Sequence, residues 1–397
     1  MAAAAPLTNG TSNDNAGEVV AAIQAQTISA DEIALYDRQI RLWGVQAQEK
    51  IRTANILLIS AKALANEVAK NLVLAGIGSL TIVDHETVTE EDLGSQFFIS
   101  DALIGQNRTE AAAPEIRRLN PRVTVKAISA PISDCLPDFY TPFTLVIATD
   151  LDFNTLSTIN AATRLANKPM YAAGGHGMYG YIFADLIQHD YVIERAKSNM
   201  PTVLGPESGS ATRSIVGVST KRENGKVVEL VTKREIYSHL RLANSSPLPP
   251  EILNSLRKLK NVSPLLPCFR ALWDFEKQKR HLPASNSVDD LREFTILAHE
   301  KLDELQMPKE LLKSELLRSF LQNVGSELAP VTAFLGGQLA QDVINVLGRR
   351  EQPIQNLVLF DGEETKAPVY SLHSFLQDAL DSIPPPLPGP LEKPMVP

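Results

Sequence analysis

Short apolar runs that alternate with helical segments dominate the first half of this 397-residue chain. The first two runs are NILLIS at 55–60 and LTIV at 80–83, with a helical pattern over 66–75 between them. Two short strands joined by a helix form a βαβ unit whose strands are parallel. The rhythm predicts an α/β fold, specifically a doubly wound and mostly parallel Rossmann-like sheet.

The alternation runs to about residue 194, stops, and returns near the C-terminus. Residues 195–325 are first mostly polar and then helical and charged, which predicts a flexible loop followed by a helical insertion. A short strand at 227–231 is the most order that we expect in the loop. Residues 326–366 contain a long helical pattern and the run LVLF, and therefore complete the α/β domain whose first part is 29–194.

Neither end of the chain has the composition of a segment that packs into a core. Residues 1–28 are rich in Ala, Asn, Thr and Gly, a composition that predicts a disordered tail. Residues 367–397 end in a stretch with seven prolines and predict a proline-rich tail. Order should begin at Ser29, which with Glu32 has the spacing of a helix capping box.

Charge and cysteine content exclude several classes of function. The 38 Lys and Arg residues against 46 Asp and Glu residues give a net charge of -8, opposite to that of a protein that attracts nucleic acid. The sequence has no apolar run that approaches the roughly 18 residues of a membrane span. Cys135 and Cys268 are too few for a disulfide framework or a paired Cys-x-x-Cys metal site. We expect a reduced intracellular protein without nucleic acid, membrane or bound metal.

The first helical pattern carries an apolar stripe and two arginines. Its apolar residues fall on one face at helical spacing: Ile33, Tyr36, Ile40 and Trp43. At about 100° per residue, Arg38 projects opposite this stripe and Arg41 lies on its flank.

The turn after the first strand is where nucleotide-binding α/β domains carry GxGxxG, because glycines let the backbone approach phosphate. Here the three glycine positions hold Ser60, Lys62 and Ala65. We therefore expect no nucleotide site in this chain. Asp84 keeps the spacing of a ribose-binding acid, 24 residues beyond Ser60, but an aspartate that caps the end of a strand fits equally well.

Several ordered motifs resemble the adenylation fold of ubiquitin-like-protein activating enzymes, of the ThiF/MoeB type. The resemblance covers about 33–365 and is greatest to the smaller subunits of heterodimeric SUMO-activating enzymes. The motifs are YDRQIRLWG at 36–44, the βαβ unit at 55–84 with HETV after it, QF at 96–97, IGQNR at 104–108, ELAPV at 327–331, GGQ at 336–338 and FDG at 360–362.

In that family an active half binds ATP and Mg²⁺ and joins AMP to the modifier's C-terminal carboxylate, and a cysteine of the large subunit then takes the modifier as a thioester. The smaller subunit is the inactive half of the pair. The resemblance thus implies a pseudoenzyme that binds no cofactor itself and pairs with a large catalytic subunit that uses ATP and Mg²⁺. It also implies contact with SUMO, with the SUMO-conjugating enzyme through the complex, and residence in the nucleus and also the cytoplasm.

Departures from the active pattern agree with an inactive half. The family's Asn-x-x-Arg before Gln-Phe is Asp92-Leu93-Gly94-Ser95, and the lysine after Gly-x-Ser is Arg108. Either Asp150 or Asp152 could match the metal-binding aspartate of the active half.

The resemblance also gives Arg38 a function. The matching arginine of the smaller subunit reaches into the large subunit's ATP site, and Arg41 is the weaker second contributor. Neither cysteine has a nearby histidine or basic cluster in the sequence, and His176 fits a turn residue, so we expect none of these three residues to be catalytic.

Two alternatives remain open. The regulatory subunit of the neddylation activating enzyme shares the DRQIRLWG run and the altered glycine loop, but its chain is substantially longer. An autonomous nucleotide-dependent adenylating enzyme would need the glycines that this sequence lacks.

Overall fold

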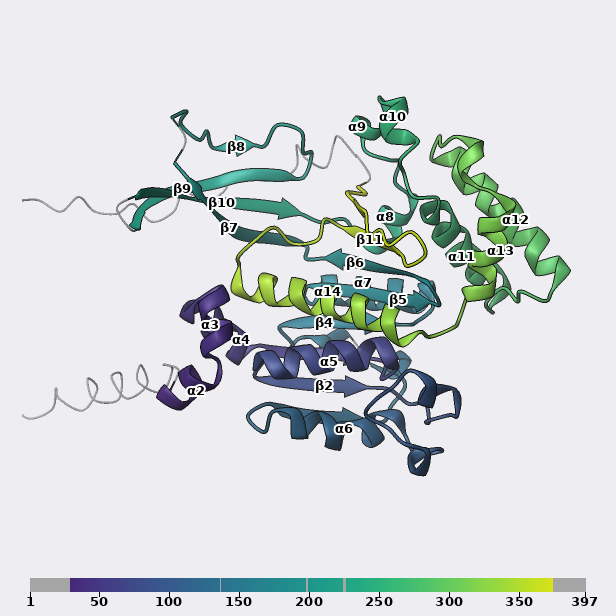
Figure 1. Cartoon of the computed structure of the whole chain (residues 1–397), viewed down its shortest axis with the longest axis horizontal. Helices are drawn as coiled ribbons and strands as arrows, with labels where there is room; N and C mark the ends of the chain where they lie inside the picture. The colour runs from purple at the N-terminus through teal and green to yellow at the C-terminus, as the bar shows by residue number, and fades with distance from the viewer. Residues whose placement is uncertain (1–28, 136, 198, 224–225, 374–397) are drawn as a thin grey trace, which may run out of the picture.

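An eight-stranded mixed sheet forms the centre of the computed structural model, which describes residues 29–135, 137–197, 199–223 and 226–373 (Figure 1). Its strand order is β12-β11-β6-β5-β4-β1-β2-β3. The five strands from β5 to β3 are parallel, and β6, β11 and β12 continue the sheet in antiparallel pairing. The predicted α/β fold with a mostly parallel sheet is confirmed. The strands are β1 (Asn55–Ile59), β2 (Ser79–Val83), β3 (Thr124–Ile128), β4 (Leu145–Thr149), β5 (Met170–His176), β6 (Tyr179–Asp185), β11 (Leu357–Asp361) and β12 (Val369–Tyr370).

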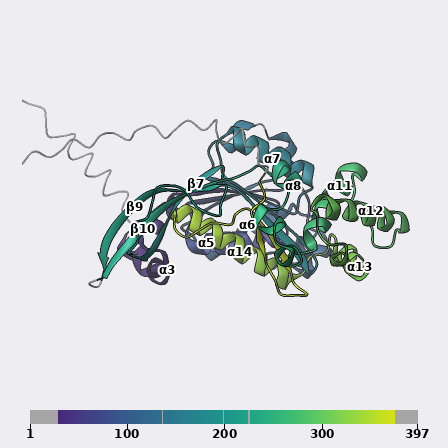
Figure 2. The same ribbon diagram turned by 90° about the horizontal axis from the view of Figure 1, so that it is seen from above.

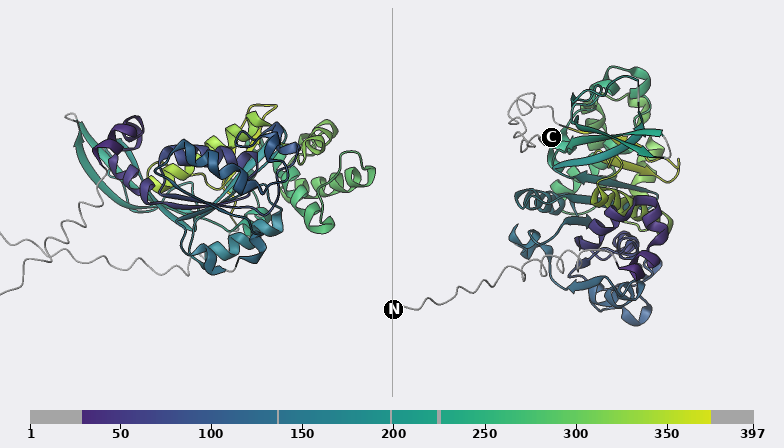
Figure 3. Two further views of the ribbon diagram at one scale, coloured as in Figure 1. Left: turned by 90° about the horizontal axis from the view of Figure 1, so that it is seen from below. Right: turned by 90° about the vertical axis from the view of Figure 1, so that its left-hand side faces the viewer.

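Helices cover both faces of this sheet (Figures 2 and 3). One face carries α5 (Ala63–Ala75), α6 (Arg108–Leu119) and α14 (Ala329–Gly348), and the other carries α7 (Phe153–Leu165). Every residue of β4 is buried, as expected for a parallel strand between two helical layers. None of the helices in the described residues has the length and apolar character that a bilayer crossing needs.

The predicted flexible loop at 195–235 is wrong. Residues in this region form most of a second, antiparallel sheet with the order β7-β10-β9-β8. Its strands are β7 (Gln188–Ala196), β8 (Gly205–Pro206), β9 (Arg213–Glu223) and β10 (Lys226–Ile236). The sequence of this region looks polar because its strands contain charged residues that are buried in pairs. Glu235, for example, is fully buried and accepts a 2.6 Å hydrogen bond from Arg213.

Helices follow this sheet, as the charged helical pattern predicts. They are α8 (Leu240–Ser245), α9 (Pro250–Leu253), α10 (Leu256–Leu259), α11 (Leu265–Lys279), α12 (Val288–Glu304) and α13 (Ser314–Asn323). Aromatic rings join them to the large sheet: Phe269 of α11 packs edge-on against Tyr181 of β6, and Phe320 of α13 stacks on Tyr179.

The N-terminal helical pattern is broken into three short helices, α2 (Ala30–Leu35), α3 (Asp37–Trp43) and α4 (Val45–Thr53). The capping box between Ser29 and Glu32 is present. The single apolar stripe is not, because the helix is interrupted at Tyr36, which ends α2 and precedes α3, and Tyr36 alone of the four stripe residues is buried. A continuous helix over this region was therefore the wrong expectation.

At the C-terminal end, ordered structure extends past the expected boundary at residue 366. β12 pairs with β11, and the following Leu372 and His373 are buried. The tails predicted for 1–28 and for the last part of 367–397 lie outside the described residues.

Gly336 lets α14 approach α5 closely. A Cβ atom at this position would lie 2.5 Å from the Cβ of Glu67, whereas a Cβ at the adjacent Gly337 would meet nothing within 4 Å. Close packing therefore requires glycine at position 336 but not at position 337.

Gly336→Ala should therefore destabilise the chain by about 1–3 kcal/mol through overpacking. Gly337→Ala should be neutral or stabilising by up to about 1 kcal/mol, because alanine favours the helix. Urea denaturation of the two variants and the wild type measures both free energies of unfolding. Equal effects of the two substitutions would contradict the close approach.

Candidate functional site

The loop between β1 and α5 occupies the position where related α/β domains bind phosphate, at the carboxyl ends of the parallel strands. Ser60 adopts φ +80°, a left-handed conformation that favours glycine. The loop thus keeps the backbone shape that a glycine normally provides. Its amide groups have partners within the chain: Ala61 N–H donates to Asp84 Oδ2 at 2.9 Å, and Lys62 N–H donates to the Ser60 hydroxyl at 3.3 Å.

Asp84 has the contacts of an aspartate that caps the end of a strand. Its carboxylate accepts one hydrogen bond from Ala61 N–H and a second, also of 2.9 Å, from Glu86 N–H. The side chain therefore fastens the loop to the end of β2. The capping interpretation accounts for these contacts without a ribose.

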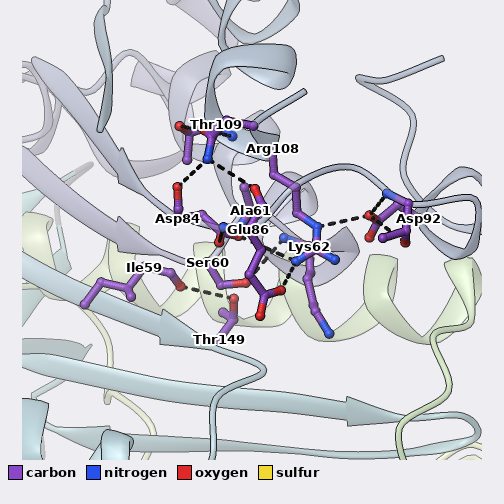
Figure 4. A network of polar contacts seen from close by, with 12 residues as sticks. Ile59, Ser60, Ala61, Lys62, Asp84, Glu86, Asp92, Arg108, Thr109 and Thr149 are labelled. Carbon is purple, nitrogen blue, oxygen red and sulfur yellow. Dashed lines mark hydrogen bonds and ion pairs between the residues drawn. The ribbon is translucent and has the colours of Figure 1, made fainter. Parts of the chain in front are cut away.

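Arg108 is the centre of a buried ion-pair network beside the loop (Figure 4). Its guanidinium donates to Asp92 Oδ2 at 3.0 Å, forms an ion pair with Glu86, and lies 4.0 Å from Asp84. Burial opposes the charge, but the hydrogen bond to Asp92 and its negative charge outweigh this and raise the pKa of Arg108. Arg108 remains charged and holds three carboxylates together.

Two of the residues at altered family positions meet a glutamate from the far end of the chain. Ser95 donates a 2.8 Å hydrogen bond to Glu327, and Lys62 lies 4.0 Å from the same carboxylate. Sequence reasoning did not identify Glu327 or Glu86 as members of this site. The ELAPV block of the family resemblance was the one signal that marked Glu327.

A small cavity of about 110 Å³ remains, lined by Ser60, Lys62, Asp84, Glu86 and Asp150 among others. At about 30 Å³ per water, it has room for a few water molecules. Three of the lining side chains are acidic and Lys62 is basic, while much of the remaining wall is apolar. Within the described residues no cluster of three His, Cys, Asp or Glu side chains could hold a metal ion.

The surroundings of Asp150 and Asp152 differ. These are the two candidates for a match to the metal-binding aspartate of the active half. Asp152 caps α7, accepting hydrogen bonds from Asn154 N–H and Thr155 N–H at 3.0 and 3.1 Å. Asp150 lines the cavity and accepts a 3.0 Å hydrogen bond from Gly175 N–H. Burial, and then the nearby charge of Glu327, raise the pKa of Asp150 to about 7.

Cys268 and His176 have buried environments typical of structural residues. Cys268 is fully buried, and burial raises the pKa of its thiol far above the ordinary value. Cys135 is half-buried. The Nδ1 atom of His176 accepts a 3.1 Å hydrogen bond from Gly325 N–H, and burial lowers the pKa of His176 to about 4. This histidine therefore ties β5 to the segment before α14.

Arg38 and Arg41 lie away from this site, on α3 at the opposite end of the sheet (Figure 1). Arg38 is exposed, and Arg41 forms a surface ion pair of 2.9 Å with Asp37. The fold therefore does not bring either arginine to the β1–α5 loop of its own chain.

Comparison with known proteins places these features in a family. The ThiF family model matches residues 36–376. DNA damage tolerance protein RHC31 of Saccharomyces cerevisiae is 37% identical over 351 residues, covering 88% of this chain and 99% of the relative. SUMO-activating enzyme subunit 1 of Xenopus tropicalis is 34% identical (87% and 97% covered), and that of Homo sapiens is 32% identical (84% and 93% covered). The chain therefore belongs to the ThiF family, and within it to the group that contains the subunit 1 proteins of SUMO-activating enzymes.

Proposed function

We propose that this chain is the non-catalytic subunit of a SUMO-activating enzyme. It pairs with a large catalytic subunit, which adenylates the C-terminal carboxylate of SUMO with ATP and Mg²⁺ and takes SUMO as a thioester. The complex then passes SUMO to its conjugating enzyme, and it resides in the nucleus and also in the cytoplasm. The buried network around Arg108, at the place where an active half would bind nucleotide, carries the proposal of an inactive half.

ATP does not fit the site of this chain. The Asp84 carboxylate and the Ser60 hydroxyl use the loop amides that would contact phosphate. The cations that could bind a triphosphate are engaged by protein carboxylates, since Arg108 pairs with Asp84 and Glu86 and Lys62 lies 4.0 Å from Glu327. No step of adenylation is therefore assigned to this site.

Arg38 is the residue of this chain that we assign to the partner's ATP. The inner face of α3 is fixed to the domain, because Gln39 donates to Leu74 C=O at 3.2 Å and Trp43 donates to Gln48 at 2.8 Å. A fixed helix presents an exposed arginine at a defined position. Its planar guanidinium offers several donors to phosphate oxygens and stabilises the charge that develops as pyrophosphate leaves. Arg41 contributes less, because Asp37 already pairs with it.

The neddylation and autonomous-enzyme alternatives are less well supported. The autonomous enzyme needs a nucleotide site, and the contacts above fill that place with protein groups. Relatives named SUMO-activating enzyme subunit 1 align over more than four fifths of this chain, which favours SUMO over the related modifier.

The isolated chain should bind Mg-ATP weakly or not at all. Titration calorimetry should detect no binding in the micromolar range, and Ser60→Gly combined with Lys62→Gly should not restore it, since Asp84 and Arg108 still fill the site. Micromolar binding by the wild-type chain alone would contradict the inactive-half assignment.

Arg38→Ala should slow SUMO-adenylate formation by about 10²- to 10³-fold while the heterodimer still assembles. Arg38→Lys should recover part of the rate, because lysine lacks the planar fork. Arg41→Ala should have a smaller effect. Pyrophosphate exchange at subsaturating ATP measures these rates.

Arg118→Ala is the control, since Arg118 is another exposed helical arginine and, like Arg41, pairs with a carboxylate of its own helix. It should leave the exchange rate unchanged. A wild-type rate for Arg38→Ala would show that Arg38 is an ordinary solvated charge.

Neither cysteine should be required for thioester formation. Cys135→Ala and Cys268→Ala, each in the assembled heterodimer, should form the SUMO thioester within a few-fold of the wild-type rate, as measured on non-reducing gels. Loss of the thioester in either variant, with the heterodimer intact, would place the reactive thiol in this chain.

A further inference from the structure

Three cationic side chains gather where α4 meets the C-terminal end of α14: Lys50, Arg349 and Arg350. All three are exposed. They belong to a chain whose net charge is -8, so a local concentration of positive charge stands out from the rest of its composition.

Backbone contacts fix the cluster in place. The Cβ that Gly348 would carry lies 3.2 Å from the Cβ of Ala47, which shows how closely α14 ends against α4. Arg350 Nη1 donates to Trp43 C=O at 3.2 Å, and Arg349 C=O accepts a 3.1 Å hydrogen bond from Val192 N–H. Three elements, α4, α14 and β7, therefore hold the cations side by side.

Few groups of the chain neutralise the cluster: the charge of Asp190 interacts with that of Arg349. Within the described part of the chain, none of the three side chains forms an ion pair with a carboxylate. Asp190 is nearby, but it is bound by Arg234 through hydrogen bonds of 2.7 and 2.8 Å. Partial burial of the amino group, and then the charges of Arg349 and Arg350, lower the pKa of Lys50 although the residue as a whole is exposed. The cations repel one another, a cost that a bound anion would remove.

The surroundings of the cluster favour a protein as the source of that anion. Leu42 and Val45, on the adjoining ends of α3 and α4, are 79% and 44% exposed. A surface that carries both apolar and cationic side chains is complementary to a protein surface with apolar and acidic ones. The hydrogen bond from Arg350 to Trp43 makes the cluster continuous with α3, the helix that carries Arg38.

We infer that Lys50, Arg349 and Arg350 form a docking surface for a carboxylate-rich segment of the large subunit. The inference rests on the proposed function and extends it, since it assigns the same end of the molecule a second task. The cluster attracts the partner and orients α3 before Arg38 reaches the partner's nucleotide. Exposed charges of this kind act mainly on the rate of association and on its salt dependence.

The test uses the full chain and the purified large subunit, with association followed by stopped-flow fluorescence at low and high salt. Lys50→Glu, Arg349→Glu and Arg350→Glu together should slow association by about 10-fold or more at low salt. The difference from wild type should shrink at high salt, where screening is strong. Replacing the same three residues by Gln should give an intermediate rate, and thermal unfolding checks that both variants are folded.

The matched control reverses three exposed cations of the helical insertion, Arg257, Lys277 and Arg292, which changes the net charge equally. This control should associate at close to the wild-type rate. The inference is wrong if the cluster variant associates as fast as wild type at low salt, or if the control slows association as much. If the wild-type chain and the large subunit do not associate at all, the proposed function itself is wrong. In that case the cluster has no large subunit to bind.

Discussion

The buried charge of Arg108 determines how the end of the parallel sheet is organised. Its partners come from three separate places: Asp84 at the end of β2, Glu86 just beyond it, and Asp92 in the short helical turn that follows. A buried arginine with one missing partner costs several kcal/mol, on the order of 3–5 kcal/mol in other proteins. These loops therefore have to keep their positions together. The contact of Asp84 with Ala61 N–H extends the constraint to the loop after β1.

Local patterns in the sequence predicted the parts of the fold that depend on local chemistry. The alternation of strand and helix gave β1, α5 and β2, and the altered glycine positions Ser60 and Lys62 predicted a site without nucleotide. The antiparallel insert was missed because Glu229 and Glu235 look like loop residues until their arginine partners on neighbouring strands are known. The contact between Ser95 and Glu327 joins residues 232 positions apart, and no local pattern encodes such a pair.

The two ends of the sheet differ in what they present to a partner. At the carboxyl ends of the parallel strands, an ion-pair network around Arg108 lies beside a cavity of about 110 Å³. At the other end, α3 and the Lys50 cluster leave their cations exposed. In the proposed heterodimer this chain contributes to catalysis through the surface that carries α3. The region around its own β1–α5 loop takes no part in that contribution.

The hydrogen bond from Ala61 N–H to Asp84 has a thermodynamic consequence. A protein that binds ATP in its folded state alone gains stability as the nucleotide concentration rises, by mass action. In this chain the Asp84 carboxylate accepts the hydrogen bond of a loop amide. An inactive half of the kind that we propose binds no ATP, so its folding equilibrium would not follow the ATP level of the cell.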